Sequence, residues 1–134
     1  MDFDGRQAIW LQIADHICER ILAGAWQPGE RVPSVRELAE EIRVNPNTVI
    51  RSYGYLQELG IIHTQRGMGY FVAEDAAAKT VELKRQDFVA RKLPVVFRTM
   101  DLIGMGWRDL KRLYDARAGA VGRPARVDTE EGSR

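Results

Sequence analysis

The chain has 134 residues, 45% of them hydrophobic, with 20 Lys and Arg against 19 Asp and Glu, so its net charge is only +1. This length excludes a large multidomain enzyme, and the single cysteine, Cys18, excludes an internal disulfide and a Cys-based zinc cluster. No apolar run reaches the roughly 18–20 residues of a membrane span, and the acidic N-terminus lacks the layout of a secretory signal, so we expect a cytoplasmic protein without membrane contact.

Isoleucines spaced four residues apart predict the first helix, over residues 7–24. They form a wide apolar stripe, which is typical of a helix packed on a core. Cys18 lies beside this stripe, and we interpret it as a small core residue. The stripe consists of Ile9, Ile13, Ile17 and Ile21.

Two further helices begin at recognisable capping signals. Ser34 and Glu37 form a capping box, in which the Ser34 hydroxyl caps the Glu37 N–H and the Glu37 side chain reaches back. After a short link, Asn45 suits the N-cap of the next helix and Pro46 its first position. Gly60 then suits a left-handed C-terminal cap.

Residues 61–72 predict a β-hairpin. Two short runs of β-branched and aromatic residues flank the Gly-rich loop Arg66–Gly69. The order of three helices and a hairpin is that of a winged helix-turn-helix, and the tightly linked helix pair carries most of this interpretation. We expect a mainly α fold with a small β-hairpin, whose winged helix-turn-helix domain spans residues 1–74.

A second region, residues 75–118, is predicted to be a short two-helix extension. A long helix begins at Ala76, is kinked or restarted at Pro94, and is followed by a short amphipathic helix near residues 107–117. Residues 119–134 have almost no large apolar groups, so we expect a disordered tail.

A heptad-like apolar seam runs along this extension. It could be the core of a monomer, but the extension has little of its own chain to pack against. We therefore favour a homodimer, which would match a palindromic DNA site. The residues expected at the dimer contact are Val89, Leu93, Val96, Met100, Ile103 and Leu110.

The helix that opens at Asn45 carries the strongest functional signal. In a helix-turn-helix the N-terminal part of the second helix touches base edges in the major groove. Asn pairs with adenine, Arg with guanine or phosphate, and Ile packs on a thymine methyl group. A plain solvated helix face is the alternative. The residues presented there are Asn47, Thr48, Ile50 and Arg51.

Two more arginines are candidate DNA contacts. Arg36 lies at a helix N-terminus, where the helix dipole disfavours a cation, so we favour a DNA partner over an ion pair with Glu40. Arg66 and Gly67 form the tip of the wing, where a cation enters a minor groove or binds phosphate; the alternative is a hairpin turn that merely needs glycine. Residues 1–73 carry seven basic and nine acidic side chains, so affinity must come from where a few arginines point.

Nothing in the sequence predicts catalysis. It lacks a phosphate-binding loop, a nucleophile elbow and a metalloprotease motif, and His16 and Cys18 are spaced to point apart on a helix. We expect no enzyme, no cofactor and no metal site. The rival function is a winged-helix protein-interaction module without sequence-specific DNA binding. An unidentified small-molecule effector near Trp107 and Tyr114 is a further alternative, although these aromatic residues are more simply core.

The combined motifs resemble the GntR family of bacterial transcription regulators. The resemblance rests on Pro28–Ala39, Val44–Val49 and Arg51–Tyr53, and the wing, residues 60–72, continues it. It implies a dimeric regulator, usually a repressor, bound to a double-stranded DNA operator.

The resemblance also implies a set of DNA-binding residues, to which we add Ser34 at the helix start and Ile50 in an apolar role. Some other subfamilies use an arginine to read bases at the position of Ile50. The short remainder after the wing resembles the two-helix extension of the YtrA-like subfamily, which mainly dimerises. The implied DNA contacts are Arg36, Asn45, Asn47, Thr48, Arg51, Arg66 and Gly67.

Overall fold

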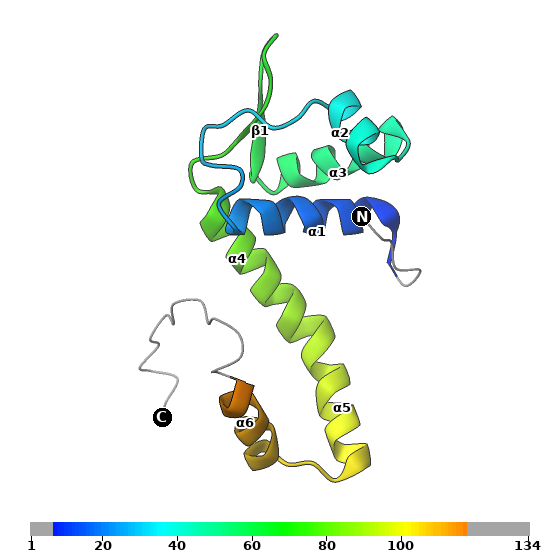
Figure 1. Ribbon diagram of the computed structural model, residues 1–134, viewed down its shortest axis with the longest axis vertical. Coiled ribbons are helices and arrows are strands. Elements are labelled where there is room, and N and C mark those ends of the chain that lie inside the picture. Colours follow the sequence, from blue (N-terminus) through cyan, green and yellow to red (C-terminus); the bar gives the residue numbers. More distant parts are fainter. Residues whose placement is uncertain (1–6, 118–134) are drawn as a thin grey trace. The chain divides into compact units, whose positions relative to one another are not determined.

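The computed structural model describes residues 7–117, which form helices and one two-stranded antiparallel sheet (Figure 1). The elements are α1 (Ile9–Leu22), α2 (Val35–Ile42), α3 (Pro46–Glu58), β1 (Ile62–Gln65), β2 (Gly69–Val72), α4 (Ala76–Asp87), a π-helical segment (Phe88–Lys92), α5 (Leu93–Ile103) and α6 (Trp107–Ala116). The predicted winged helix-turn-helix with a helical extension is confirmed. The tail expected at residues 119–134 lies outside the described residues.

The described chain divides into two compact units that meet between Phe88 and Val89. The sequence placed the domain boundary at residue 74, before α4. The structure instead groups α4 with the first unit, because Ala76 and Thr80 are buried and the helix packs on α1. We call residues 7–88 the winged unit and residues 89–117 the extension.

One apolar core holds the winged unit together. The stripe predicted on α1 is buried from Ile13 onward, whereas Ile9 at its start is half exposed. Cys18 is buried beside the stripe, as predicted, and this burial raises the pKa of its thiol to about 11. The inner face of α3 joins the same core through Val49, Tyr53 and Leu56.

The turn between α2 and α3 is short because both helix ends are capped locally. Arg43 ends α2 in the left-handed conformation, with φ 57°, and Asn45 already caps α3. The Tyr53 hydroxyl then donates a hydrogen bond of 2.6 Å to the Pro33 carbonyl, which precedes the first residues of α2. This bond ties α3 to the start of α2 and helps to set the angle between the two helices.

The wing is an antiparallel hairpin in which Ile62 pairs with Val72 and Gln65 with Gly69. The sequence did not reveal that the segment before α2 also pairs with β2. Arg31 bridges Phe71, and Val32 N donates to the Tyr70 carbonyl at 2.9 Å. Strand β2 is therefore hydrogen-bonded along both of its edges, to β1 on one side and to the segment before α2 on the other. The tip of the wing projects from the helices (Figure 1).

The restart predicted at Pro94 takes the form of a π-helical segment, Phe88–Lys92, followed by α5. Pro94 has no N–H to donate to the carbonyl four residues earlier, so the regular α-helical ladder cannot run through this point. Pro94 instead occupies the first turn of α5, where a missing N–H is tolerated.

The Tyr53 hydrogen bond gives a stability prediction. We expect Tyr53→Phe to lower the free energy of unfolding by about 1–2 kcal/mol, because the Pro33 carbonyl loses its partner in a partly buried site. Urea denaturation followed by circular dichroism measures this. Tyr70→Phe is the matched control, since the Tyr70 ring packs against Tyr53 at 4.9 Å and keeps that contact. Equal stability of the two variants would contradict the role assigned to the bond.

Candidate nucleic-acid interface

The outer face of α3 brings together the residues predicted to touch base edges. Asn47 and Arg51 are exposed, and Ile50 exposes 51% of its surface even though it is a large apolar residue. Thr48 lies half-buried at the edge of the face. Because the opposite face of α3 is fixed in the core, the geometry leaves this face as a surface of polar side chains around one aliphatic group.

Arg51 is held in place by a residue that the sequence analysis missed. Its guanidinium carbon lies 4.5 Å from the centre of the Trp10 ring. Trp10 comes from α1, outside the helix-turn-helix motif. The apolar pattern of α1 gave no signal for this role, because Trp10 reads there as one more hydrophobic residue.

Two of the predicted site residues serve first as helix caps. The Asn45 Oδ1 accepts a hydrogen bond of 2.8 Å from the Asn47 N–H, and the Ser34 Oγ accepts one of 3.1 Å from the Glu37 N–H. Each cap therefore shapes the start of a helix whose next residues are exposed. The cap at Asn45 uses only the amide oxygen, so the two N–H donors of the Asn45 side chain are not used by it.

Arg36 is exposed in the first turn of α2. Within residues 7–117 it forms no ion pair with Glu40, which was the alternative considered from the sequence. The described chain thus provides no internal partner that would explain a cation at this helix N-terminus.

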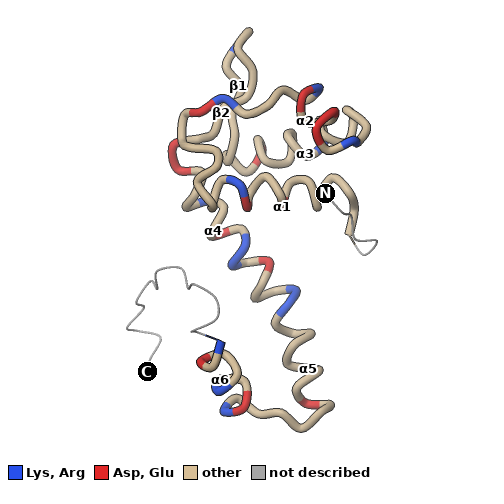
Figure 2. The backbone as a smooth tube through the Cα atoms, in the orientation of Figure 1, with Lys and Arg blue, Asp and Glu red and all other residues tan. Residues whose placement is uncertain are grey.

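Arg66 lies in the turn between β1 and β2 and is exposed to solvent. Figure 2 shows a stretch coloured for Lys or Arg near the free end of this hairpin. Gly67 has φ +74°, and no heavy atom beyond Gly67 itself and its two chain neighbours lies within 4 Å of where its Cβ would be. The backbone conformation therefore requires the glycine, and the open space around it lets another molecule approach the main chain.

Arg31 is a second residue that the sequence analysis missed. Its Nε donates a hydrogen bond of 3.1 Å to the Met68 carbonyl, so the guanidinium holds the loop at the wing tip. A Cβ on Gly69 would come within 3.2 Å of the same Nε, so the glycine makes room for this contact. Nothing in the linear motif distinguishes Arg31 as a brace, because its partner lies 37 residues away.

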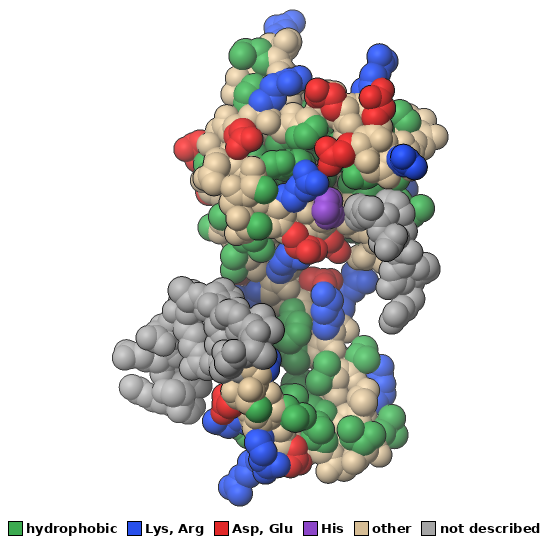
Figure 3. Space-filling view, in the orientation of Figure 1, with side chains coloured by type: hydrophobic (Ala, Val, Ile, Leu, Met, Phe, Trp, Pro, Cys, Tyr) green, Lys and Arg blue, Asp and Glu red, His purple; other side chains and the backbone are tan. Residues whose placement is uncertain are grey.

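Acidic side chains are also exposed on the winged unit (Figure 3), but local partners hold several of them. Glu41 pairs with Arg20 at 3.1 Å, and Glu30 accepts a hydrogen bond from the Gln27 N–H at 2.9 Å. A hydrogen bond from the Ser34 N–H to the Glu37 carboxylate lowers the pKa of Glu37 below its usual value, and a hydrogen bond from the Ser34 hydroxyl lowers it further by a smaller amount. These contacts fix the three side chains in place.

In the extension, the predicted seam is only partly covered. Val89 and Ile103 are exposed, and the four other seam residues are half-buried. Trp107 and Tyr114 expose 68% and 46% of their surfaces, so the expectation that they belong to a core is wrong for the described chain. The physical reason is that no residue of the described extension is buried, so these helices have no core of their own. The half-buried seam residues are Leu93, Val96, Met100 and Leu110.

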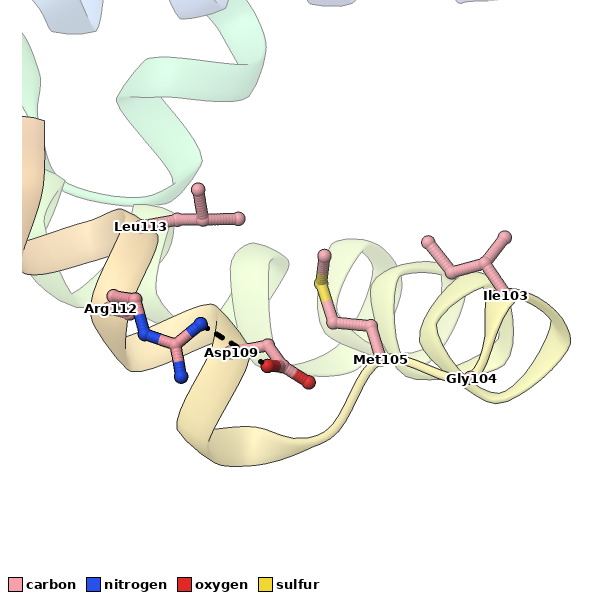
Figure 4. Close-up of a pocket in the computed structure, with 6 residues that line it drawn as sticks. All are labelled: Ile103, Gly104, Met105, Asp109, Arg112 and Leu113. Atoms are coloured by element: carbon pink, nitrogen blue, oxygen red, sulfur yellow. Dashed lines mark ion pairs between the residues drawn. The ribbon is translucent and has the colours of Figure 1, made fainter.

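A shallow pocket of about 340 Å³ lies at the turn between α5 and α6 (Figure 4). The side chains of Ile103, Met105 and Leu113 point to the same side, and Asp109 pairs with Arg112 at 3.6 Å. Neither aromatic residue proposed for an effector lines this pocket. It offers an apolar surface with one exposed ion pair, which gives little to orient a small molecule.

Within residues 7–117, no group of three or more His, Cys, Asp or Glu side chains is arranged to hold a metal ion. No helix in this range is long and apolar enough to cross a bilayer.

Comparison with known proteins identifies the family. Residues 10–72 match the model of bacterial regulatory proteins of the gntR family. The solved structure of a GntR-family transcriptional regulator from Bacteroides thetaiotaomicron aligns with a TM-score of 0.70 and 39% identity, covering 81% of this chain and 95% of that one. The chain belongs to the GntR family.

Two regulators of Bacillus subtilis (strain 168) are also similar to this GntR-family chain. The HTH-type transcriptional regulator YhcF is 47% identical over 74 residues, which are 55% of this chain and 61% of YhcF. The HTH-type transcriptional repressor YtrA is 46% identical over 76 residues, which are 57% of this chain and 58% of YtrA. The match thus spans about three fifths of either relative. These relatives are named as regulators rather than enzymes, in agreement with the function class expected from the sequence.

The capping box gives a prediction with a defined sign. Because the pKa of Glu37 is lowered on folding, its carboxylate stabilises the protein above the ordinary Glu pKa, and this contribution is lost as the pH falls through the lowered value. We expect Ser34→Ala to raise the pKa of Glu37 part of the way back, while Ser34→Thr keeps it low. Carboxyl ¹³C NMR titration measures both. An unchanged Glu37 titration in Ser34→Ala would show that the hydroxyl has no part in it.

Proposed function

We propose that this GntR-family chain is a homodimeric, sequence-specific DNA-binding transcription regulator that acts in the cytoplasm and represses by occupying a pseudo-palindromic operator. The observation that carries the proposal is the exposed outer face of α3, with Asn47, Ile50 and Arg51 around its N-terminal half. A helix placed in this way in a helix-turn-helix enters the major groove with its N-terminal residues against base edges.

Each residue of the interface has a role that follows from its chemistry. The Asn47 amide suits adenine, the Arg51 guanidinium suits guanine or a phosphate, and the Ile50 side chain suits a thymine methyl group. Arg36 and Arg66 suit phosphates or a narrow minor groove, and they position the protein more than they select a sequence.

The remaining candidates support the backbone of the interface. Ser34 and Asn45 shape the two helix starts by capping them. Thr48 lies at the edge of the outer face of α3, where its hydroxyl suits a phosphate. Gly67 lets the wing backbone approach the duplex.

The second copy is the partner we propose for the extension. An apolar helix that is exposed in the monomer is costly in water, and a two-fold dimer would cover it while presenting two α3 helices to two half-sites. The exposed apolar residues of α5 and α6, including Ile103 and Trp107, support this assignment. We prefer the second subunit to an effector as the group that covers the exposed ring of Tyr114. Repression is proposed from the similarity to YtrA, which is named a repressor.

Selection of binding sites from random duplex DNA tests the DNA-binding proposal. We expect one enriched inverted repeat, and we expect Arg51→Ala to weaken binding to it by about tenfold, because a good base contact discriminates by 1–3 kcal/mol. We expect Arg36→Ala to weaken binding to the selected and to an unrelated duplex alike, because a phosphate contact carries no sequence information. Fluorescence anisotropy at fixed salt measures the affinity. Arg20→Ala, whose guanidinium already pairs with Glu41, is the control. Without an enriched sequence the protein-interaction alternative would hold.

The oligomeric state tests the seam. We expect the double variant Val96→Asp and Met100→Asp to be monomeric, because two carboxylates would be desolvated at the subunit contact. Sedimentation velocity measures the mass in solution. Leu102→Asp lies on another face of α5 and is the matched control, expected to leave the dimer intact. A dimer that persists in the double variant would show that the seam is misplaced.

A further inference from the structure

Trp10 occupies a defined position against the outer part of α3. It is the second residue of α1, and its ring lies between two α3 residues that are one turn apart. The Arg51 guanidinium lies over the ring at 4.5 Å, and the Tyr55 ring meets it edge-on, with 5.3 Å between ring centres and an angle of 71°. The indole is thus bounded by a cation and by an aromatic edge.

The backbone of Trp10 is anchored as well. The buried Ser52 hydroxyl donates a hydrogen bond of 2.7 Å to the Trp10 carbonyl, and its oxygen lies 3.1 Å from the Thr48 carbonyl. Ser52 directly follows Arg51 in the chain. Ser52 therefore fixes the main chain of Trp10, while the ring of Trp10 contacts the side chain of Arg51. These two contacts together fix the position of the Trp10 ring relative to the Arg51 guanidinium.

Arg51 differs from the other stacked arginine of the winged unit in what its N–H groups contact. Arg20 lies over the Trp26 ring at 5.6 Å, but its guanidinium is also bound to Glu41 at 3.1 Å. Within the described residues Arg51 contacts only an aromatic face. An aromatic ring takes no carboxylate-type hydrogen bonds from a guanidinium, so the N–H groups of Arg51 can still donate to a further partner.

We propose that Trp10 is a positioning residue for DNA recognition, which holds the Arg51 guanidinium ready for the duplex. This inference rests on the DNA-binding function proposed above. An unrestrained arginine loses side-chain entropy when DNA immobilises it. Arg51 pays less of this cost because the indole already restricts its side chain in the free protein. Trp10 thereby contributes to affinity from α1, through Arg51.

A double-mutant cycle on the duplex selected by the wild-type protein tests the inference. We expect Trp10→Leu to weaken binding about three- to tenfold, in the range of the cost of ordering one side chain, and Trp10→Phe to retain most of the affinity. In the Arg51→Ala background we expect Trp10→Leu to change the affinity less than twofold. Equal losses in both backgrounds would show that Trp10 acts only on the fold, and would overturn the inference.

The same experiment separates this inference from the proposed function. Loss of sequence preference in the wild type would overturn both. Selective wild-type binding with full affinity in Arg51→Ala would overturn the positioning role and leave the function standing. Arg20→Ala is the matched control, and thermal unfolding of each variant shows that it is folded.

A measurement without DNA keeps the inference testable even if Trp10→Leu fails to fold. In the free wild-type protein we expect the ring current of Trp10 to shift the Nε–Hε NMR resonance of Arg51 upfield. The reference is the Nε–Hε resonances of those arginines that have no aromatic partner. An unshifted Arg51 resonance would show that the stack does not persist in solution, and would overturn the inference.

Discussion

The burial of one face of α3 in the core of the winged unit is the constraint on which the rest depends. Val49, Tyr53 and Leu56 are fully buried there, and the 3.6-residue repeat of the helix then fixes which side chains face solvent. The outer face carries Asn47, Ile50 and Arg51 because the inner face carries the apolar stripe. A recognition surface is therefore a direct consequence of the way in which this helix is packed.

The polar contacts of the winged unit divide into those that build the surface and those that are left for a partner. Caps and braces use Ser34, Asn45 and Arg31 within the chain. Arg36 and Arg66 form no such contacts within the described residues, and Arg51 contacts an aromatic ring alone. With nine basic and eleven acidic side chains in residues 7–88, the winged unit has no excess of positive charge. Its suitability for DNA depends on which cations are unpaired and where they lie.

The extension has the opposite character, since its exposed groups are mostly apolar. Residues such as Ile103, Trp107 and Leu113 face solvent, and Figure 3 shows hydrophobic side chains gathered over this unit. The described extension is too small to bury them by itself. Isolated amphipathic helices of this length are marginal in water, so the extension has a physical requirement for a further surface, which the proposed dimer would supply.

Local signals in the sequence determined the elements of this protein, because caps and periodicity act over a few residues. The capping box at Ser34, the N-cap at Asn45 and the apolar stripes predicted α1, α2, α3 and the hairpin, and hence the outer face of α3. Contacts between residues far apart in the chain leave no such local trace. The bridge of Arg31 to the wing, the packing of α4 on α1 and the stack of Trp10 on Arg51 were decided by the tertiary structure alone, because each depends on how separate helices and strands are brought together by the core.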